Sequence, residues 1–288
     1  MFTYVVTSYR NPDQLVRLLT RLRAGSPDAR LVVSHDRKSA PLDVGLLDAL
    51  GADYRRTPTA ITWGDGSYLR SVLAVFEDLA LEPTEWVTLL TAQDYPLRPL
   101  RDYEARLRKG DVDTILEVGP DDDLLERYRR RGWVVPPWAD RSLVARVVMK
   151  TPGVHWAPRP FGARPRVEVR RLRTPFGPQL RLHKGGDLFA LNGKAMAALL
   201  AAPKSLLAYY DGCSIPSESY PHTVLLNAPG LRNDSKILHY CRWEASAHPE
   251  WLGVDDLADM LASGHYFARK FHQDDPVLDR LDDVLSLA

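Results

Sequence analysis

The stretch WVTLLTAQDYP, residues 86–96, opens as an apolar, β-branched run and closes on polar residues and a proline. A continuous apolar run of this length is typical of a strand buried on both faces of a sheet. Three further segments are expected to be strands: FTYVVTSY at residues 2–9, ARLVVSHD at residues 29–36 and TILEV at residues 114–118. These runs predict a buried sheet in the first half of the chain.

Helical patterns separate these strands. Asn11 and Pro12 precede leucines at helical spacing, so Asn11 is expected to cap a helix and Pro12 to lie in its first turn. After the strand at residues 29–36 a loop is expected, followed by a second helix over residues 66–81, and residues 187–192 are expected to form a strand leading into a helix around residues 194–200. Strands that alternate with helices predict an α/β fold, with a mixed, mostly parallel central sheet flanked by helices.

The carboxyl ends of the first three predicted strands are polar. In open α/β sheets, ligands bind beyond these strand ends. The three exits are Thr7–Arg10, Ser34–Lys38 and Thr91–Pro96. Together they predict a binding site at one edge of the sheet, without indicating its ligand.

The composition is that of an ordinary globular protein. The chain has 288 residues, of which 45% are hydrophobic, and its formal net charge is +1. That charge leaves no overall field to hold nucleic acid or an anionic membrane surface. Local basic clusters remain at residues 127–131 and 164–173, and they can still meet an anionic ligand.

No segment predicts a membrane span or a disulfide framework. No apolar run approaches the roughly 20 residues that a spanning helix needs, and the N-terminus shows no signal-peptide pattern. The two cysteines, Cys213 and Cys241, form neither a disulfide framework nor a paired-CxxC metal site. A cytoplasmic protein without a nucleic-acid partner is therefore expected.

Six segments carry a resemblance to a known family. They are VVSHDRKS at residues 32–39, WGDGS at 63–67, WVTLLTAQDYPLR at 86–98, KGGDLFAL at 184–191, PSESYPHTVL at 216–225 and FARKF at 267–271. Their order and sequences resemble those of the core-2/I-branching β-N-acetylglucosaminyltransferase family, which includes peptide O-xylosyltransferases and plant glucuronosyltransferases. The segment from Asp121 to Arg181 matches none of its motifs.

The resemblance implies a GT-A-type fold, a UDP-sugar donor, inversion to a β-glycoside and no essential metal or other cofactor. It implies one glycosyltransferase domain with a nucleotide-sugar-binding part (1–119), a variable Arg- and Trp-rich acceptor segment (120–182) and a catalytic, diphosphate-binding part (183–288). The middle part is expected to form long loops with one or two helices. The donor sugar would be GlcNAc, xylose or similar, and the acceptor a small molecule or glycan. Leu188 replaces the family's tryptophan, with Asp187 before it, so the sugar's identity does not carry over.

The resemblance also implies roles for individual residues. An inverting transfer needs one carboxylate to accept the proton of the acceptor hydroxyl, and Glu218 occupies the position of the family's catalytic glutamate. Its alternative reading is a helix N-terminal glutamate that complements the helix dipole. Arg269 and Lys270 are expected to bind the diphosphate, the alternative being a solvated pair at the end of a helix.

The remaining candidates concern the nucleotide and the donor sugar. Asp36 is expected to accept hydrogen bonds from uridine, with Arg37 nearby, and Asp94 to face the donor sugar or ribose; both aspartates have a turn-forming alternative. Ser8, Trp63 and Ser67 are further candidates for the donor pocket.

Two other functions stay open from the residues alone. Asp121–Asp123 follow a predicted strand, where a divalent cation could bind hard oxygen ligands, as in a metal-dependent transferase. A catalytically silent nucleotide- or glycan-binding protein on the same scaffold is the second alternative. Only one carboxylate ends the third strand, in Gln93-Asp94-Tyr95, so no metal is expected at that exit.

Overall fold

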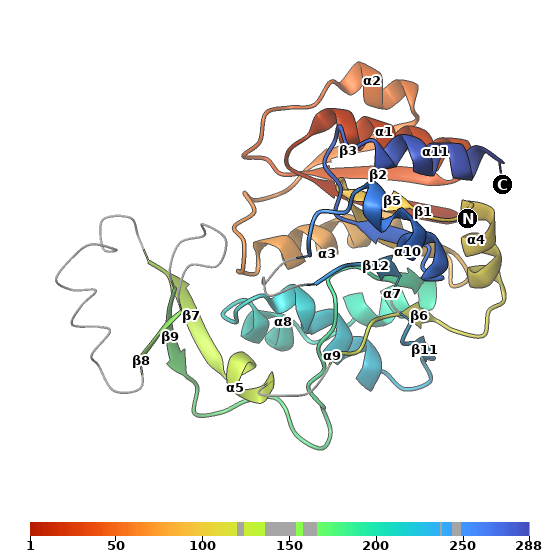
Figure 1. Ribbon diagram of the computed structural model, residues 1–288. Helices are drawn as coiled ribbons and strands as arrows, with labels where there is room; N and C mark the ends of the chain where they lie inside the picture. Colours follow the sequence, from red (N-terminus) through yellow and green to blue (C-terminus); the bar gives the residue numbers. More distant parts are fainter. Residues whose placement is uncertain (120–123, 136–153, 158–165, 237, 244–248, 288) are drawn as a thin grey trace.

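One seven-stranded sheet organises the chain (Figure 1). The computed structural model describes residues 1–119, 124–135, 154–157, 166–236, 238–243 and 249–287. The strand order is β11-β6-β10-β4-β1-β2-β3. The parallel strands are β1 (Phe2–Ser8), β2 (Arg30–His35), β3 (Ala52–Arg56) and β4 (Trp86–Thr91). The others are β10 (Ala190–Asn192), antiparallel to its neighbours, β6 (Thr114–Ile115) and β11 (Asn233–Asp234).

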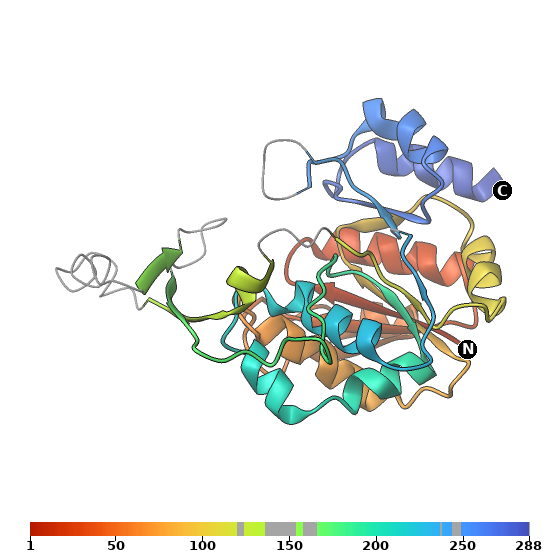
Figure 2. The same ribbon diagram turned by 90° about the horizontal axis from the view of Figure 1, so that it is seen from below.

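Helices cover both faces of this sheet (Figure 2). One face packs against α1 (Pro12–Gly25), α4 (Leu100–Arg108) and α11 (Val277–Leu287). The other packs against α3 (Ser67–Leu79), α7 (Gly193–Leu200), α8 (Lys204–Tyr210) and α9 (Tyr220–Asn227). Val5 and Val6 of β1 belong to different core clusters, which is why the strand reads as a continuous apolar run. The predicted α/β fold, with a mixed, mostly parallel sheet flanked by helices, is confirmed.

Two local predictions in the first half are wrong. Pro12 begins α1 as expected, but Asn11 before it has a left-handed backbone, with φ 53°, and its side chain makes no capping hydrogen bond. The stretch after β2, expected to be a loop, contains α2 (Val44–Ala49) and β3. β3 has the polar sequence ADYRR and lies at the edge of the sheet, so it lacks the apolar run that marks a buried strand.

A second sheet joins distant parts of the chain. It contains β12 (His239–Tyr240), β13 (Phe267–Arg269) and β5 (Asp94–Pro96) in that order. The register pairs Arg269 with Asp94, so two of the motif segments meet directly. The main sheet likewise takes strands from both the N-terminal and the C-terminal part of the chain.

A three-stranded antiparallel sheet projects from the body (Figure 1). It consists of β7 (Arg130–Val134), β9 (Arg166–Arg170) and β8 (Val154–Ala157), and α5 (Leu124–Tyr128) precedes it. Among the described residues, α5 agrees with the expected one or two helices, whereas the three strands were not expected. Strands β7 and β9 are far apart in sequence, and their pairing leaves no local signal. Across the described residues, no helix is long and apolar enough to cross a bilayer.

Candidate active site

The three predicted strand exits meet at one edge of the sheet. The Ser8 hydroxyl lies 2.6 Å from Nδ1 of His35, and the Ser8 carbonyl accepts a 2.9 Å hydrogen bond from the N–H of Asp36. The N–H of Ala92 donates to the carbonyl of Thr7. Ser8 is buried, and its hydroxyl is engaged with the imidazole. The three exits therefore lie side by side in space, as the sequence predicts.

Asp36 and Arg37 hold the loop that follows β3. Asp36 is buried, and its Oδ1 accepts hydrogen bonds from the N–H groups of Lys38 (3.2 Å) and Ile61 (3.1 Å). Arg37 is exposed and donates to the carbonyl of Pro58 at 2.5 Å. Both side chains thereby shape the wall of an adjacent groove.

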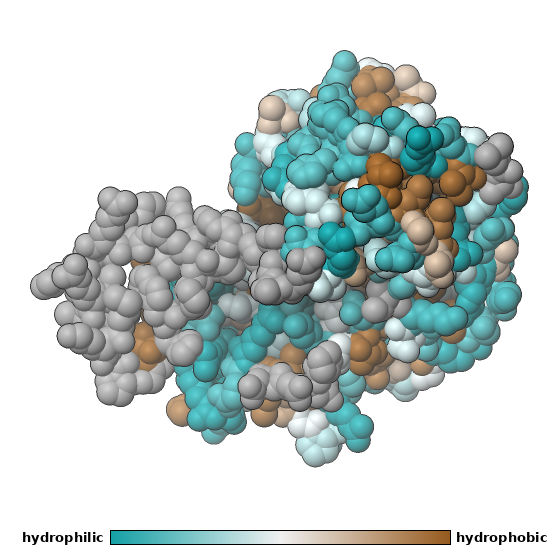
Figure 3. Space-filling model, in the orientation of Figure 1, coloured by the Kyte–Doolittle hydropathy of each residue, from teal (hydrophilic) through white to brown (hydrophobic). Residues whose placement is uncertain are grey.

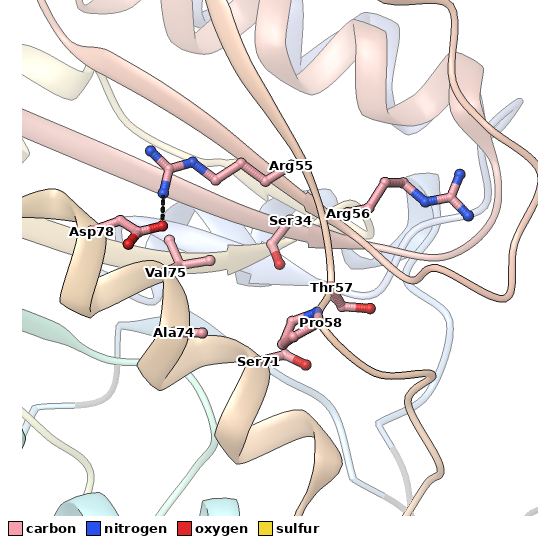
Figure 4. Close-up of a pocket in the computed structure, with 9 residues that line it drawn as sticks. All are labelled: Ser34, Arg55, Arg56, Thr57, Pro58, Ser71, Ala74, Val75 and Asp78. Carbon is pink, nitrogen blue, oxygen red and sulfur yellow. Dashed lines mark hydrogen bonds and ion pairs between the residues drawn. The ribbon is translucent and has the colours of Figure 1, made fainter.

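This groove lies between α3 and the ends of β2 and β3 (Figure 4). Its volume is about 630 Å³, and its lining is Ser34, Arg55, Arg56, Thr57, Pro58, Ser71, Ala74, Val75 and Asp78. Arg55 and Asp78 form a 2.7 Å ion pair at its end. Hydroxyl groups beside an apolar floor suit a nucleoside-sized group. The carboxylates of Asp94, Asp187 and Glu218 do not line this groove. Helix α3 extends from the groove toward them, because Tyr68 in its first turn lies within electrostatic reach of Asp187 and Asp94.

Asp94, the first residue of β5, is fully buried just beyond the end of β4. Its Oδ1 lies 3.3 Å from Nε of Arg269. Its Oδ2 lies 3.3 Å from Nε2 of His239 and accepts a 2.7 Å hydrogen bond from the N–H of Thr91. Burial alone would raise the pKa of this carboxyl, but the charges of His239 and Arg269 outweigh it, so the pKa lies below its usual range. Asp94 thus holds Arg269 in a fixed orientation.

Arg269 and Lys270 lie in a cationic region. Lys270 is 9% exposed, and its ammonium group lies 4.5 Å from the centroid of the Trp251 ring, which stacks on His272. Burial and then the charge of Arg269 lower the pKa of Lys270, and Arg10 contributes in the same direction. Several cations in a partly buried place provide a suitable environment for a phosphate group.

Glu218 ends the short helix η1 (Pro216–Glu218), just before α9. Its Oε2 lies 3.1 Å from Nη2 of Arg127 and 3.5 Å from Nζ of Lys184, and its side chain is 26% exposed. Its carbonyl accepts a 2.9 Å hydrogen bond from the N–H of Gly185. The glutamate is thus accessible and held by two cations from other segments.

Two carboxylates that the sequence did not single out as site residues lie beside Glu218. The Oδ1 of Asp187 is buried and has no hydrogen-bond partner among the described residues. Burial, followed by the negative charge of Glu218, raises the pKa of Asp187 to about 6. Burial also raises the pKa of Glu117, while Lys184 opposes the shift. Asp187 lies within the KGGDLFAL motif, and Glu117 follows β6, so both positions carried a signal.

Position 185 requires a glycine, because neighbouring atoms approach its Cα too closely for a side chain. A Cβ at this position would lie 1.9 Å from the carbonyl oxygen of Glu117 and 2.4 Å from Nε2 of His222. We expect Gly185→Ala to lower the free energy of unfolding by about 3 kcal/mol, the upper end of over-packing effects. Urea unfolding measures this change. Gly177→Ala is the control, because a Cβ there meets nothing within 4 Å; equal stability of the two variants would contradict the packing argument.

His222 gives the fold a specific pH dependence. The imidazole is fully buried, and burial, then the charge of His183, lowers its pKa to about 4, although the backbone carbonyl of Glu117 acts in the opposite direction. The unfolded chain binds this proton below about pH 6.5, so stability is complete above that pH and decreases as pH falls toward 4. The loss should total about 3 kcal/mol.

Urea unfolding of wild type and His222→Leu at several pH values tests this expectation. Leucine does not titrate, so the stability difference between the two proteins should change across this window. Parallel stability curves would show that His222 does not titrate as described.

Trp63 and Ser67 lie at the start of α3. Trp63 is 43% exposed. The Ser67 hydroxyl donates to Asp65 at 2.5 Å and accepts from the N–H of Thr62 at 2.8 Å, which closes the turn that carries Trp63. The carbonyl of Gly64, in the same turn, accepts a 3.0 Å hydrogen bond from Arg166.

The structure thus groups the predicted residues in three places. Asp36 and Arg37 lie beside the groove, with Ser8 contacting the neighbouring His35, and Trp63 and Ser67 lie at the start of α3. Arg269 and Glu218 lie around Asp187, with Asp94 in contact with Arg269 and Lys270 next to it in sequence. Among the described residues, no group of three His, Cys, Asp or Glu side chains could hold a metal ion. The alternative cation site, Asp121–Asp123, lies outside the described residues.

Comparison with known proteins finds partial sequence relatives. No family model matches the chain. It is 41% identical over 87 residues to β-glucuronosyltransferase GlcAT14A of Arabidopsis thaliana, covering 29% of this chain and 20% of the relative. It is 28% identical over 208 residues to GlcAT14C of the same plant, covering 69% of this chain and 48% of that relative. The matches thus span half or less of each relative.

Two solved structures show a weak likeness. Galactosyltransferase LgtC, in complex with donor and acceptor sugar analogs, aligns over 100% of this chain and 96% of its own, at 11% identity and a TM-score of 0.45. A putative glucose-1-phosphate thymidylyltransferase from Bacillus anthracis, in complex with sucrose, aligns over 72% of this chain and 78% of its own, at 7% identity and a TM-score of 0.34. Both scores are low, so the fold assignment rests on the sheet topology. In sequence, the chain is similar to plant glycosyltransferases over part of their length.

Proposed function

We propose that the chain is an inverting glycosyltransferase of the core-2/I-branching type, which moves a sugar from UDP to an acceptor hydroxyl without an essential metal. The observation that carries this proposal is the convergence of an accessible carboxylate, Glu218, and an oriented cation, Arg269, around Asp187. A proton acceptor and a phosphate-binding group are the two elements that such a transfer requires.

Glu218 is the general base in this proposal. The acceptor oxygen bonds to the anomeric carbon of the donor sugar as the bond from that carbon to the diphosphate oxygen breaks. The acceptor proton passes to the carboxylate, and UDP leaves with the electron pair. Arg127 and Lys184 fix the direction of this carboxylate, since both contact the same oxygen.

Arg269 and Lys270 bind the diphosphate and meet its developing charge. Asp94 is a positioning residue here, because its carboxylate is fully buried and contacts Arg269 directly. The groove beside Asp36 and Arg37 would take the nucleoside. Trp63 and Ser67 would border the donor sugar. That sugar is GlcNAc, xylose or, following the names of the plant relatives, glucuronic acid.

Calorimetric titration with UDP, in EDTA and again with Mn²⁺, tests the donor site. Binding in EDTA, with GDP and dTDP weaker, supports the proposal. Binding only with Mn²⁺ would indicate a metal-dependent transferase, and Asp121–Asp123 would then be the first residues to replace. Binding without transfer or donor hydrolysis would indicate a catalytically silent binding protein.

Asp187→Asn is expected to raise the stability of the protein at neutral pH. The pKa of Asp187 in the folded protein lies near 6, above the ordinary value of 3.8. Between pH 3.8 and 6 the folded chain therefore keeps a proton on Asp187 that the unfolded chain has lost, and the free energy of unfolding falls as pH rises through this range. Asparagine stays neutral, so the gain should reach about 3 kcal/mol at neutral pH and vanish toward pH 4. Urea unfolding at both pH values measures it, and a gain that is equal at both would contradict the charge argument.

A further inference from the structure

Strand β9 of the projecting sheet carries two buried charged side chains. In Figure 3 the described surface at the base of this sheet is mainly hydrophilic. Nevertheless, Arg166, in the basic stretch at residues 164–173, is only 8% exposed, and Glu168 is only 7% exposed. Glu168 accepts a 2.6 Å hydrogen bond from the Ser214 hydroxyl. Burial of a charged group is costly unless hydrogen bonds replace the water that it loses, so the partners of Arg166 decide why it lies there.

The guanidinium of Arg166 joins three segments that are distant in the sequence. Its Nη1 donates to the carbonyl of Gly64 at 3.0 Å, and its Nη2 donates to the carbonyls of Gly132 at 3.2 Å and Cys213 at 3.5 Å. Gly132 belongs to β7. Gly64 belongs to residues 62–67, which we call the donor-side turn, and Cys213 to residues 213–218, which we call the base turn. A planar guanidinium can donate in several fixed directions at once, so one side chain connects the projecting sheet with both turns.

The two turns are also bonded to each other directly. The carbonyl of Gly64 accepts a second hydrogen bond, from the N–H of Ile215 at 2.9 Å. The carbonyl of Ile215 in turn accepts from the N–H of Glu218 at 3.3 Å and from the Tyr128 hydroxyl at 3.0 Å. Ile215 therefore connects the donor-side turn with the short helix η1 that ends at Glu218.

The backbone of Ile215 needs these partners. Its φ is 47° and its ψ is 61°, a left-handed conformation that β-branched residues rarely adopt. Such a conformation persists only where the surrounding structure holds it. The hydrogen bonds from Ile215 to Gly64 and from Tyr128 to Ile215 therefore hold the residue that precedes η1.

We propose that Arg166 is a positioning residue for the transfer reaction. It fixes the carbonyl of Gly64, this carbonyl holds Ile215, and Ile215 sets the start of the helix that ends at Glu218. Loss of the guanidinium would let the two turns shift and would move the carboxylate relative to the donor sugar. The inference rests on the proposed function, in which Glu218 is the general base and the donor-side turn borders the sugar.

Strand β7 leaves space for this guanidinium at Gly132. A Cβ at position 132 would lie 2.9 Å from Nε and from Nη2 of Arg166. The N–H of Gly132 donates to the carbonyl of Gly212 at 2.7 Å, so the backbone of β7 is itself attached to the body beside the base turn. An alanine at position 132 would therefore displace the guanidinium without removing it.

Arg166→Met tests the proposal through its separate effects on catalysis and on UDP binding. Methionine keeps a long side chain but donates no hydrogen bond, so kcat should fall about 10- to 100-fold, the effect of a misplaced catalytic group. UDP affinity should stay close to that of wild type, because UDP lacks the sugar and Arg269 comes from β13, where it contacts Asp94. Arg166→Lys should restore part of kcat, since an ammonium group still donates to a carbonyl.

The matched control is Arg170→Met. Arg170 lies on the same strand and is ion-paired with Glu126 at 2.8 Å, but its side chain is 59% exposed. Its replacement should leave both kcat and UDP affinity unchanged. A loss of UDP affinity in Arg166→Met as large as its loss of kcat would assign Arg166 to the stability of the fold alone.

Gly132→Ala is a second variant, which keeps the arginine. It should lower kcat about tenfold by displacing the guanidinium. The double variant Gly132→Ala/Arg166→Met should be no slower than Arg166→Met alone, because both changes act through the same group. Losses that simply add would contradict this coupling.

Hydrogen exchange of the backbone amides distinguishes this inference from the proposed function, because it needs no sugar transfer. Amides of the donor-side turn and of the base turn should exchange faster in Arg166→Met than in wild type, whereas those of β13 should not change. Unchanged exchange in both turns, or an unchanged kcat, would overturn the role of Arg166. If the wild-type protein transfers no sugar, the proposed function is wrong, and faster exchange would then show only that Arg166 links the two turns.

Discussion

Glu218→Gln should lower kcat by about 10²–10⁴-fold, the usual contribution of a general base. Glutamine has nearly the same shape but cannot accept the acceptor proton, so the reaction loses its base and the site keeps its packing. UDP affinity should stay close to that of wild type, because the contacts of Glu218 are with Arg127 and Lys184 and not with the phosphate-binding cations. Initial rates and UDP titration measure the two quantities.

Glu126→Gln is the matched control for this variant. Glu126 is also ion-paired with arginines, at 2.8 Å from Arg170, but it lies on α5 with 43% of its side chain exposed. Its replacement should leave kcat unchanged. If Glu218→Gln retains turnover and Asp187→Asn abolishes it, the base is Asp187 and the assignment of Glu218 is wrong.

Arg269→Ala should weaken UDP binding roughly 100-fold, since removing a buried charged partner costs about 2–5 kcal/mol. It should also destabilise the fold, because Asp94 is 0% exposed and would lose a cation that lies 3.3 Å away. Calorimetric titration in EDTA measures the affinity, and urea unfolding measures the stability.

A double variant separates these two effects. Asp94→Asn/Arg269→Ala removes the buried charge together with its partner, so much of the stability should return while UDP binding stays weak. Arg232→Ala is the control: its arginine also lies near an aspartate, Asp113, at 3.5 Å, but is 58% exposed. Recovery of UDP binding in the double variant would show that Arg269 acts only through the fold.

Much of the main sheet could be predicted from the sequence. Strands β1, β2 and β4 are recognisable because they are buried on both faces, and that burial requires a continuous apolar run within a few residues. The same is true of α3, whose apolar side chains recur at helical spacing. Glu218 and Arg269 became candidates because their motifs are local as well, each within five to ten residues.

The sequence alone therefore determined the α/β class, the buried strands and the polar strand exits. Only the tertiary structure decided that β3 completes the sheet edge, that β5 pairs with β13, and that Asp94 is a buried partner of Arg269. It also decided the raised pKa of Asp187, which depends on burial and on Glu218, a residue of another segment. Local sequence patterns indicate which side chains are apolar enough to be buried. The pairing of distant strands and the electrostatic effect of neighbouring charges depend on which segments lie close together in the folded chain, and a local pattern does not contain that information.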